Sequence, residues 1–133
     1  MITYSITVKT AMMQAVADKL DAATTAGYLL LYSAAQPAAG AAITDQILLA
    51  DIELAKPCGT VASGVLTLDC PVADDNVPAS GTLIWGRLYD GDSNWIADGD
   101  VGLEGSGAMI ELNSVTSYQG GIVRITAAVL GLN

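Results

Sequence analysis

The sequence has no histidine and no phenylalanine, and its five lysines and arginines are outnumbered by fourteen aspartates and glutamates, giving a formal net charge of −9. Histidine is the most common general base and the most common zinc ligand, so the chain lacks the usual residue for an acid–base catalytic site and for a zinc site. Nucleic-acid binding needs a basic surface to meet the phosphates, and the composition does not supply one. Two cysteines are too few for a structural zinc site. We therefore expect no nucleic-acid partner, no metal and no cofactor.

Long apolar runs are also missing, although apolar residues make up 52% of the chain. A helix that spans a bilayer needs about 18 or more apolar residues in a row, and the richest stretch, YLLLYSAA at residues 28–35, is far shorter. The N-terminus lacks the basic-then-apolar order of a secretion signal. A chain of 133 residues has the length of one domain with a single core. The composition predicts one soluble domain over residues 1–133, with no membrane contact and no export information.

The two cysteines flank a predicted turn at residues 62–64. If that turn joins two strands, Cys70 lies opposite residues two or three positions from Cys58, and a disulfide is conceivable. Two half-buried free thiols fit a cytoplasmic product better than a bridge does. The sequence favours free thiols and leaves the disulfide open.

The first nine residues alternate in polarity. Polar residues fall between four apolar ones: Ile2, Tyr4, Ile6 and Val8. This period of two predicts a strand or an extended arm over residues 1–9. A regular terminal strand must either join its own sheet or pair with a neighbouring subunit. These four apolar residues are therefore candidate interface residues.

A helical period follows over residues 11–26. Polar residues oppose one apolar stripe, formed by Met13, Val16, Leu20 and Ala23. Thr10 is a suitable N-cap, and Gly27 is a suitable C-terminal stop. We predict a single helix here.

Beyond Gly27 the pattern is that of β-structure. Residues 34–46 are rich in small residues and predict a loop. Strands are predicted within residues 28–33, 48–56, 64–75, 79–90, 94–102, 107–114 and 120–133. With the N-terminal strand this makes about eight, separated by turn residues. The predicted fold class is mainly β (α+β): an antiparallel sandwich or barrel with one N-terminal α-helix.

The stretch LYDGDSNWIADGD, residues 88–100, raises the question of a metal site. Its first ligand-like residues, Asp90, Asp92 and Asn94, match the first three positions of a helix–loop–helix calcium loop. That loop also needs glycine at its sixth position and glutamate at its twelfth, where this sequence has Trp95 and Val101. The required loop is therefore not present.

A β-hairpin explains the same stretch better. Asp-Gly and Ser-Asn tolerate the backbone angles of tight turns, and both flanks alternate as strands do. Asp98 and Asp100 alternate with small residues, so we expect them to face solvent. A different calcium geometry stays open, because four oxygen-bearing side chains lie close in sequence: Asp90, Asp92, Asp98 and Asp100.

Large side chains gather around the predicted hairpin. Trp85, Arg87 and Tyr89 share one strand face before the turn, and Trp95 follows it. In a chain without phenylalanine, both tryptophans are expected to anchor a core or an interface. We therefore add Trp85, Arg87 and Trp95 to the candidate interface residues. Arg87 and Lys56 are candidates because cations are scarce, although lone surface charges are the more ordinary interpretation.

Several segments in order resemble a group of small structural proteins of tailed bacteriophages, often encoded beside the major capsid protein. They are VADKLDA…GYLLLYSAAQPA, LLADIELAKPCG…GVLTLDCPVAD, ASGTLIWGRLYDGDSNWIADGDVG and IELNSVTSYQGGIVRITAAVLGL. The resemblance covers nearly the whole chain and is most specific over residues 79–102. Gly86 departs from the bulkier residue expected between Trp85 and Arg87, and we expect it to loosen that strand.

The resemblance implies a virion component without enzymatic activity and with no catalytic residues. The implied role is a capsid decoration (cement) protein that binds the outer surface of the head and stabilises it, with a minor tail or tail-fibre-base protein as the alternative. The implied partners are the major capsid protein and copies of the same chain, in a homotrimer. The protein would be made in the host bacterial cytoplasm and be located on the capsid surface of the virion. An acidic chain also suits a surface that faces away from packaged DNA.

The composition is also compatible with two other classes of protein. A carbohydrate-binding β-module would use Trp85, Trp95 and Tyr89 as an aromatic platform, with the aspartates as acceptors. Packed tryptophans are the more ordinary arrangement in one small core. A tryptophan-lined sugar site is therefore the less favoured interpretation.

The second alternative class is a carboxylate enzyme such as a glycosidase. It needs two carboxyl groups across a cleft, in unlike environments. The available pairs are Asp74 with Asp75 and Asp98 with Asp100. The first looks like a solvated turn, and without histidine no usual nucleophile–base pair can be assembled. We therefore expect no enzymatic activity.

Overall fold

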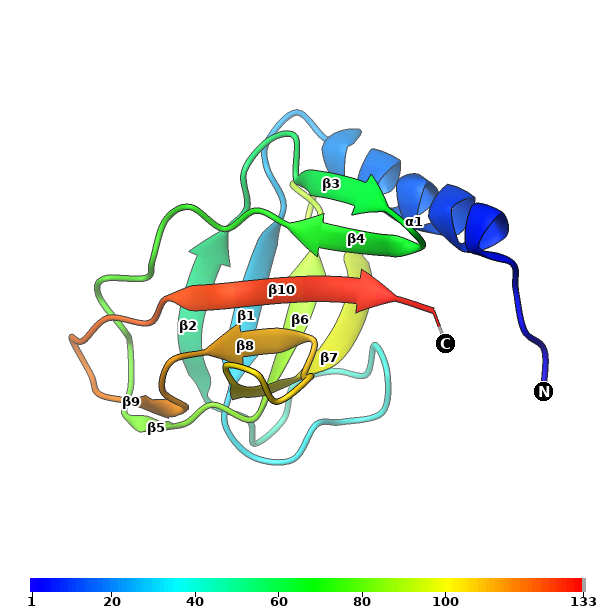
Figure 1. The fold of residues 1–133 in the computed structure, drawn as a ribbon. Helices are drawn as coiled ribbons and strands as arrows, with labels where there is room; N and C mark the ends of the chain where they lie inside the picture. Colours follow the sequence, from blue (N-terminus) through cyan, green and yellow to red (C-terminus); the bar gives the residue numbers. More distant parts are fainter. Residues whose placement is uncertain (133) are drawn as a thin grey trace.

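The computed structural model describes residues 1–132, which form one helix and ten strands (Figure 1). Helix α1 spans Ile6–Asp21. In chain order the strands are β1 Tyr28–Tyr32, β2 Leu48–Glu53, β3 Gly59–Ala62, β4 Val65–Leu68, β5 Gly81–Thr82, β6 Trp85–Tyr89, β7 Trp95–Leu103, β8 Ile110–Leu112, β9 Thr116–Ser117 and β10 Ile125–Gly131. The predicted class, mainly β with one N-terminal helix, is confirmed. No helix among the described residues is long and apolar enough to cross a bilayer.

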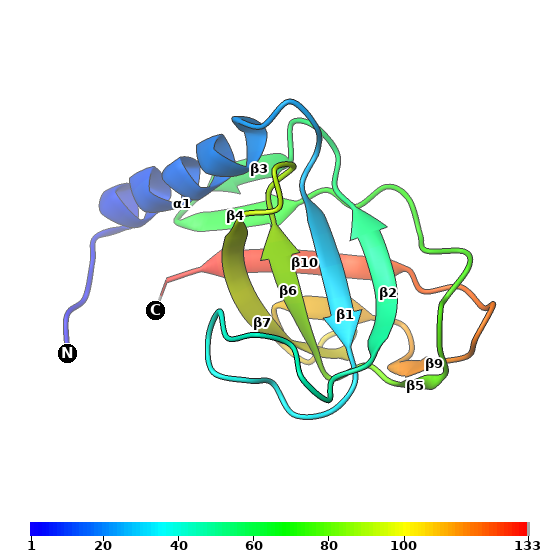
Figure 2. The same cartoon turned by 180° about the vertical axis from the view of Figure 1, so that it is seen from behind.

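Eight strands make one curled sheet in the order β2-β1-β6-β7-β8-β10-β4-β3, and β5 and β9 make a small second sheet. The curl gives a half-barrel, seen from its two sides in Figures 1 and 2. Neighbouring strands are antiparallel as predicted, except that β7 and β8 are parallel. Helix α1 packs against β3 and β4 at one end of the half-barrel.

The helix begins at Ile6, not at residue 11, so the predicted strand over residues 1–9 is wrong, and an extended arm can include only residues 1–5. Ser5 is the N-cap, and its hydroxyl accepts a hydrogen bond from the amide of Val8 at 3.3 Å. Such a cap satisfies a free amide of the first turn. Met1–Ser5 lie outside any helix or strand. The short alternation was therefore misleading, because a capping residue inside it starts a helix.

The helix ends at Asp21, earlier than the predicted residue 26. Lys56 explains this end, because its Nζ donates to the carbonyl oxygens of Asp21 and Ala23, at 2.6 Å each. A cation at a helix C-terminus also complements the helix dipole. Lys56 is an exposed charge, and within its own chain it binds the end of α1.

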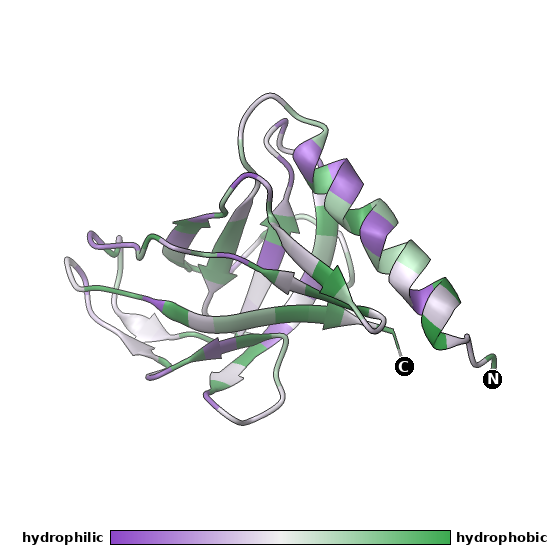
Figure 3. Cartoon of the chain, turned by 45° about the horizontal axis from the view of Figure 1, so that its top comes forward, coloured by the Kyte–Doolittle hydropathy of each residue, from purple (hydrophilic) through white to green (hydrophobic). Residues whose placement is uncertain are grey.

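The main core lies inside the half-barrel, under α1. Its buried side chains include Met13, Ala17, Leu20, Leu29, Leu31, Leu49, Ile52, Leu66, Leu88, Ile110 and Leu112. Burying each leucine or isoleucine contributes about 1.5–3 kcal/mol of transfer free energy. In Figure 3 hydrophobic and hydrophilic residues alternate along α1 and the strands, as expected for elements with one buried face.

Gly86 packs closely and does not loosen β6. A Cβ at this position would lie 2.6 Å from Cδ1 of Ile110 and 2.7 Å from Cδ2 of Leu31. The missing side chain therefore lets two core residues pack directly on the β6 backbone.

The cysteines are both free, which agrees with the favoured interpretation. Cys58 is buried and Cys70 is partly buried. Burial raises the pKa of each thiol to about 11. At neutral pH both are therefore protonated and weakly nucleophilic.

Candidate functional site

A second buried cluster lies on the outer face of the sheet, away from the main core. Along β6, Gly86 and Leu88 face the core, so Trp85 and Arg87 point to the other side. Trp85 is nevertheless 0% exposed and Arg87 only 4% exposed. The segment 33–47, between β1 and β2, covers them; it is the cyan loop of Figure 2.

The centre of this cluster is an ion pair between facing residues of β6 and β7. Arg87 and Asp98 are directly opposite in the antiparallel ladder. Nε of Arg87 donates to Oδ1 of Asp98 at 2.6 Å, and a terminal nitrogen donates to Oδ2 at 2.9 Å. Their side chains are 4% and 2% exposed. This is the planar, bidentate geometry that makes arginine–carboxylate pairs strong.

The covering segment is tied to the same pair. The third nitrogen of Arg87 donates to the carbonyl of Ala41 at 2.7 Å, and the amide of Gly40 donates to Asp98 at 3.0 Å. Gly40 has a φ of 72° and lies against the ring of Trp95, where a Cβ would come within 2.9 Å. Residues 33–47 therefore act as a brace over the outer face.

Electrostatics at Asp98 favour its charged form. Burial acts to raise its pKa, but hydrogen bonds from Arg87, from the Gly40 amide and from the Trp95 indole outweigh burial and hold the pKa below its usual value. The pKa of Arg87 is raised, chiefly by its hydrogen bond to Asp98. Both groups are therefore ionised at neutral pH and neutralise each other.

Aromatic rings extend the cluster along the strands. Tyr32 stacks on Trp85 with ring centroids 4.8 Å apart, and Tyr28 stacks on Tyr89 at 5.2 Å. The guanidinium of Arg87 lies 5.2 Å from the Trp85 ring centroid, a cation–π arrangement. Both tryptophans were expected to be packed; this holds for Trp85, whereas Trp95 is 46% exposed.

The acidic stretch is the tip of the β6–β7 hairpin, as predicted. Asp90 is buried, and its Oδ1 accepts from the amides of Asp92 and Asn94 at 3.0 and 2.9 Å. Its Oδ2 accepts from the Asn94 side chain at 3.0 Å, and Lys19 lies 3.8 Å away. These hydrogen bonds, led by the Asn94 amide, lower the pKa of Asp90. Asp90 therefore closes the turn.

The four aspartates of the stretch do not converge on a common point. Asp98 was expected to face solvent, and this is wrong, because its partner Arg87 and the brace enclose it. Asp100 is exposed and accepts from the Met109 amide at 2.9 Å. No group of three or more potential metal ligands gathers anywhere within residues 1–132.

The other carboxylate pair considered for catalysis, Asp74 with Asp75, also has structural contacts. Asp74 accepts from the backbone amides of Asp51 at 2.9 Å and Asn76 at 3.0 Å. It belongs to a connecting segment whose backbone pairs with Val123. The carboxylate is therefore used to hold that segment against β2.

The candidate interface residues fall into two groups. Ile2, Ile6 and Val8 are exposed, and Tyr4 is partly exposed, at and before the start of α1. Trp95 is available on the outer face. Trp85 and Arg87 lie under the brace, so no partner can contact their side chains while residues 33–47 are in place.

The bracing role of residues 33–47 was missed from the sequence, which predicted only a loop. One signal was available: along β6 both alternating sets, Trp85 with Arg87 and Gly86 with Leu88, avoid small polar residues. A strand with a large apolar side chain on each face, such as Trp85 and Leu88, is typical of one covered on both sides.

Chemically, the outer-face cluster is a structural support whose charged groups are paired, while the indole Nε1 of Trp85 is buried and has no hydrogen-bond partner among the described residues. Its one cation and its carboxylate neutralise each other, and its stacked rings contact one another. No protein family, curated protein or solved structure was found to match this chain. Its function therefore has to be inferred from its own surfaces.

Proposed function

We propose that this chain is a non-enzymatic structural protein of a tailed-bacteriophage virion, a capsid decoration protein that binds the outer surface of the head and stabilises it. In this proposal its partners are the major capsid protein and other copies of the chain, arranged as a homotrimer on the capsid surface. The resemblance of residues 79–102 and their flanking segments to small phage structural proteins gives the class. The surface of the chain supports it.

One observation supports a contact role above the others: apolar side chains are exposed together at the start of α1. Met1, Ile2, Ile6 and Val8 are all exposed, and Ile2 is 67% exposed. Neighbouring apolar residues left in water usually mark a surface that a partner covers. A protein that works by binding other proteins has a reason to keep such a surface.

The polar groups support a structural role for a different reason. Arg87 with Asp98, Asp90 with the hairpin amides, and Asp74 with β2 each hold one part of the chain to another. Carboxylates that perform catalysis need to face a substrate in a cleft. Here their oxygens are occupied by donors of the same chain. The net charge of −9 suits attraction to basic patches of a capsid subunit.

Co-sedimentation tests the proposal. The purified chain is mixed with heads of its phage that lack it, and the pellet is measured as a function of protein concentration. We expect saturable binding at a fixed ratio to capsid subunits, and no further binding to heads that already carry the protein. Absence of binding to the bare heads would contradict the decoration role. Binding to isolated tails would then support the tail or fibre-base alternative.

Trp95 is the observation that favours the carbohydrate-binding alternative, because it is half exposed and lies next to Asp98. Its indole, however, already donates to Asp98 at 3.0 Å. Fluorescence of a Trp85→Phe variant reports on Trp95 alone. We expect no change in its emission on addition of surface glycans of the host, and a saturable shift would favour the sugar-binding function instead.

A further inference from the structure

The large sheet has a strand position that is only partly filled. Strand β8 lies between β7 and β10, but it pairs with β7 only at Val101–Leu103 and with β10 only from Ile125 to Ala128. Among the described strands, residues 95–100 of β7 therefore pair with β6 alone. On β10 the amide of Val129 still donates to the carbonyl of Met109 at 2.9 Å, so only Leu130 and Gly131 pair with β4 alone. Beyond the start of β8, one edge of β7 and one edge of β10 face each other with no strand between them.

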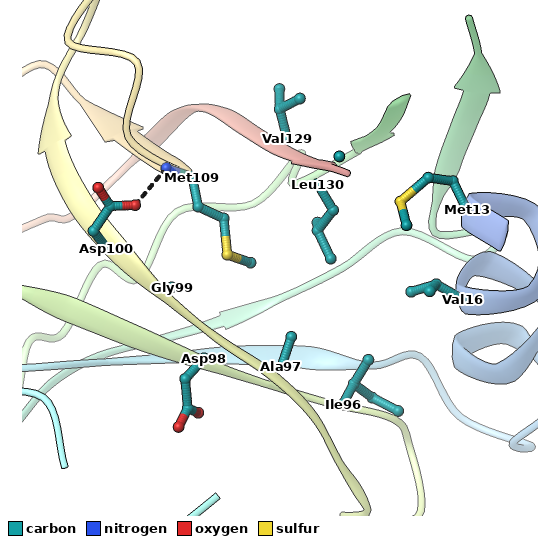
Figure 4. Close-up of a pocket in the computed structure, with 11 residues that line it drawn as sticks. Met13, Val16, Ile96, Ala97, Asp98, Gly99, Asp100, Met109, Val129 and Leu130 are labelled. Carbon is teal, nitrogen blue, oxygen red and sulfur yellow. Dashed lines mark hydrogen bonds between the residues drawn. The ribbon is translucent and has the colours of Figure 1, made fainter. Parts of the chain in front are cut away.

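A groove of about 400 Å³ occupies this place. Its apolar lining comes from α1, β7, β10 and the residue before β8: Met13, Val16, Ile96, Ala97, Met109 and Leu130. Figure 4 shows Leu130 extending from β10 and Ile96 and Ala97 extending from β7 toward the space between them, with Met13 at its side. Asp98 points away, and Asp100 is bound to the Met109 amide. A strand edge beside flexible methionine side chains suits an added extended segment.

We propose that this groove receives the segment Met1–Ser5 of a second copy of the chain, which adds a short strand between β7 and β10. In an extended segment, Ile2 and Tyr4 point to one side and Thr3 and Ser5 to the other. The apolar pair would cover the groove lining, and the polar pair would face water. The proposal explains why residues 1–5 keep a strand-like alternation although they belong to no strand of their own chain.

The length of the segment Met1–Ser5 favours binding to the groove of a second copy over binding to the groove of its own chain. Five extended residues span about 17 Å, which is enough to cover the β7 edge from Ile96 to Gly99; Met109 already lies beside Asp100. Within one chain, Met13 lies eight residues into the helix after Ser5, roughly 12 Å along its axis. A segment that folded back along its own helix would bring only its first one or two residues to the groove. The segment projects away from the body in Figures 1 and 2, where a second copy can take up all of it.

Charge favours the same pairing. Residues 1–17 contain no carboxylate and include Lys9, whereas the β7 edge has the exposed Asp100. Two copies with a net charge of −9 repel each other over most of their surfaces. Contact between a carboxylate-free segment and an acidic edge avoids that repulsion. A head-to-tail contact of this kind closes into a ring when the rotation allows, as a trimer requires. The inference rests on the self-association included in the proposed function.

Molecular mass in solution is the first test, by size-exclusion chromatography with light scattering over a range of concentrations. We expect the wild-type chain to form an oligomer. Ile2→Asn with Tyr4→Asn should raise the dissociation constant by roughly tenfold or more. These changes leave the Ser5 cap in place. The matched control, Val72→Asn with Ile122→Asn, changes two exposed apolar residues elsewhere and should keep the wild-type mass. A wild-type monomer at every concentration, or an unchanged double variant, would overturn the proposal.

Cross-linking places the contact. Chains with Thr3→Cys, on the side of the segment that faces water, and chains with the exposed Val129→Cys, each with Cys70→Ser and a different tag, are mixed and oxidised. We expect a disulfide between the two tags, and none when Ile122→Cys replaces Val129→Cys. A chain that carries both introduced cysteines is oxidised as well. If the disulfide forms only within that chain, the segment occupies the groove of its own chain, and the proposed contact between two copies is wrong. No capsid enters either test, so failure here and failure of head binding are separate results.

Discussion

At the scale of single residues, the Arg87–Asp98 pair is a buried, bidentate contact between opposite charges. Each side chain is almost fully removed from water, and each satisfies the charge of the other. Removing one partner of such a pair leaves an uncompensated buried charge, which costs about 3–5 kcal/mol. A mutation that removes one partner therefore lowers the free energy of unfolding by much more than the intact pair contributes to it.

We predict that Asp98→Asn lowers the free energy of unfolding by about 3 kcal/mol or more, because Arg87 stays buried without a counter-charge. Urea denaturation followed by circular dichroism measures this change. Asp100→Asn is the matched control, since Asp100 is exposed on the same strand, and it should stay within about 1 kcal/mol of wild type. Equal stability of the two variants would show that the buried pair is not as described.

The free energy of unfolding should also depend on pH through Asp98. The pKa of Asp98, like that of Asp90, is lower in the folded chain than its ordinary value. Such a group contributes stability that is complete above the unfolded pKa and is lost as the pH falls through the folded pKa. Asp51 acts in the opposite sense, because burial and the nearby Asp74 and Glu53 raise its pKa.

We therefore predict that the free energy of unfolding decreases below about pH 4. Asp98→Asn should make this decrease smaller, whereas Asp51→Asn should make it steeper. Denaturation curves at several pH values between neutral and acid measure both slopes. A decrease as steep in Asp98→Asn as in wild type would contradict the role assigned to this carboxylate.

Gly86 gives a second prediction at this scale. Gly86→Ala places a Cβ within 2.7 Å of Leu31 and Ile110, and overpacking of this kind costs about 1–3 kcal/mol. Gly131→Ala is the control, because its nearest atom would be at an ordinary 3.7 Å. Thermal unfolding compares the two. A Gly86→Ala variant as stable as the control would mean that the core adapts at this point.

At the scale of elements, the sequence identified the middle of each element better than its ends. The stripe with Met13 and Leu20 predicted the helix, and alternation predicted β2, β6 and β7. The helix start was missed because Ser5 lies inside a run that also alternates, and only the cap hydrogen bond decides between the two periods. The brace at residues 33–47 was missed because its contacts are made by backbone atoms, such as the Ala41 carbonyl.

The cap itself can be tested. We predict that Ser5→Ala lowers the free energy of unfolding by about 1 kcal/mol, because the Val8 amide loses its acceptor. Thr3→Ala, in the same extended segment, should have no measurable effect. Chemical denaturation of both variants provides the comparison, and equal effects would remove Ser5 from its capping role.

At the scale of the whole molecule, the class and approximate number of strands followed from the sequence, but their order did not. The parallel β7–β8 pair and the partly filled position beside it depend on which segments meet across the curl. Local patterns contain no information about such pairings. The interface candidates show the same limit, since Trp85 and Ile2 look equally apolar in the sequence but only Ile2 is exposed.

The proposed decoration role places this chain on the outside of a phage head. The most direct measurement is cryo-electron microscopy of bare heads after incubation with the purified chain. We expect density for the half-barrel at regular, symmetry-related sites on the outer surface, in clusters joined by their N-terminal segments. Heads that show no added density at saturating protein would contradict the claim.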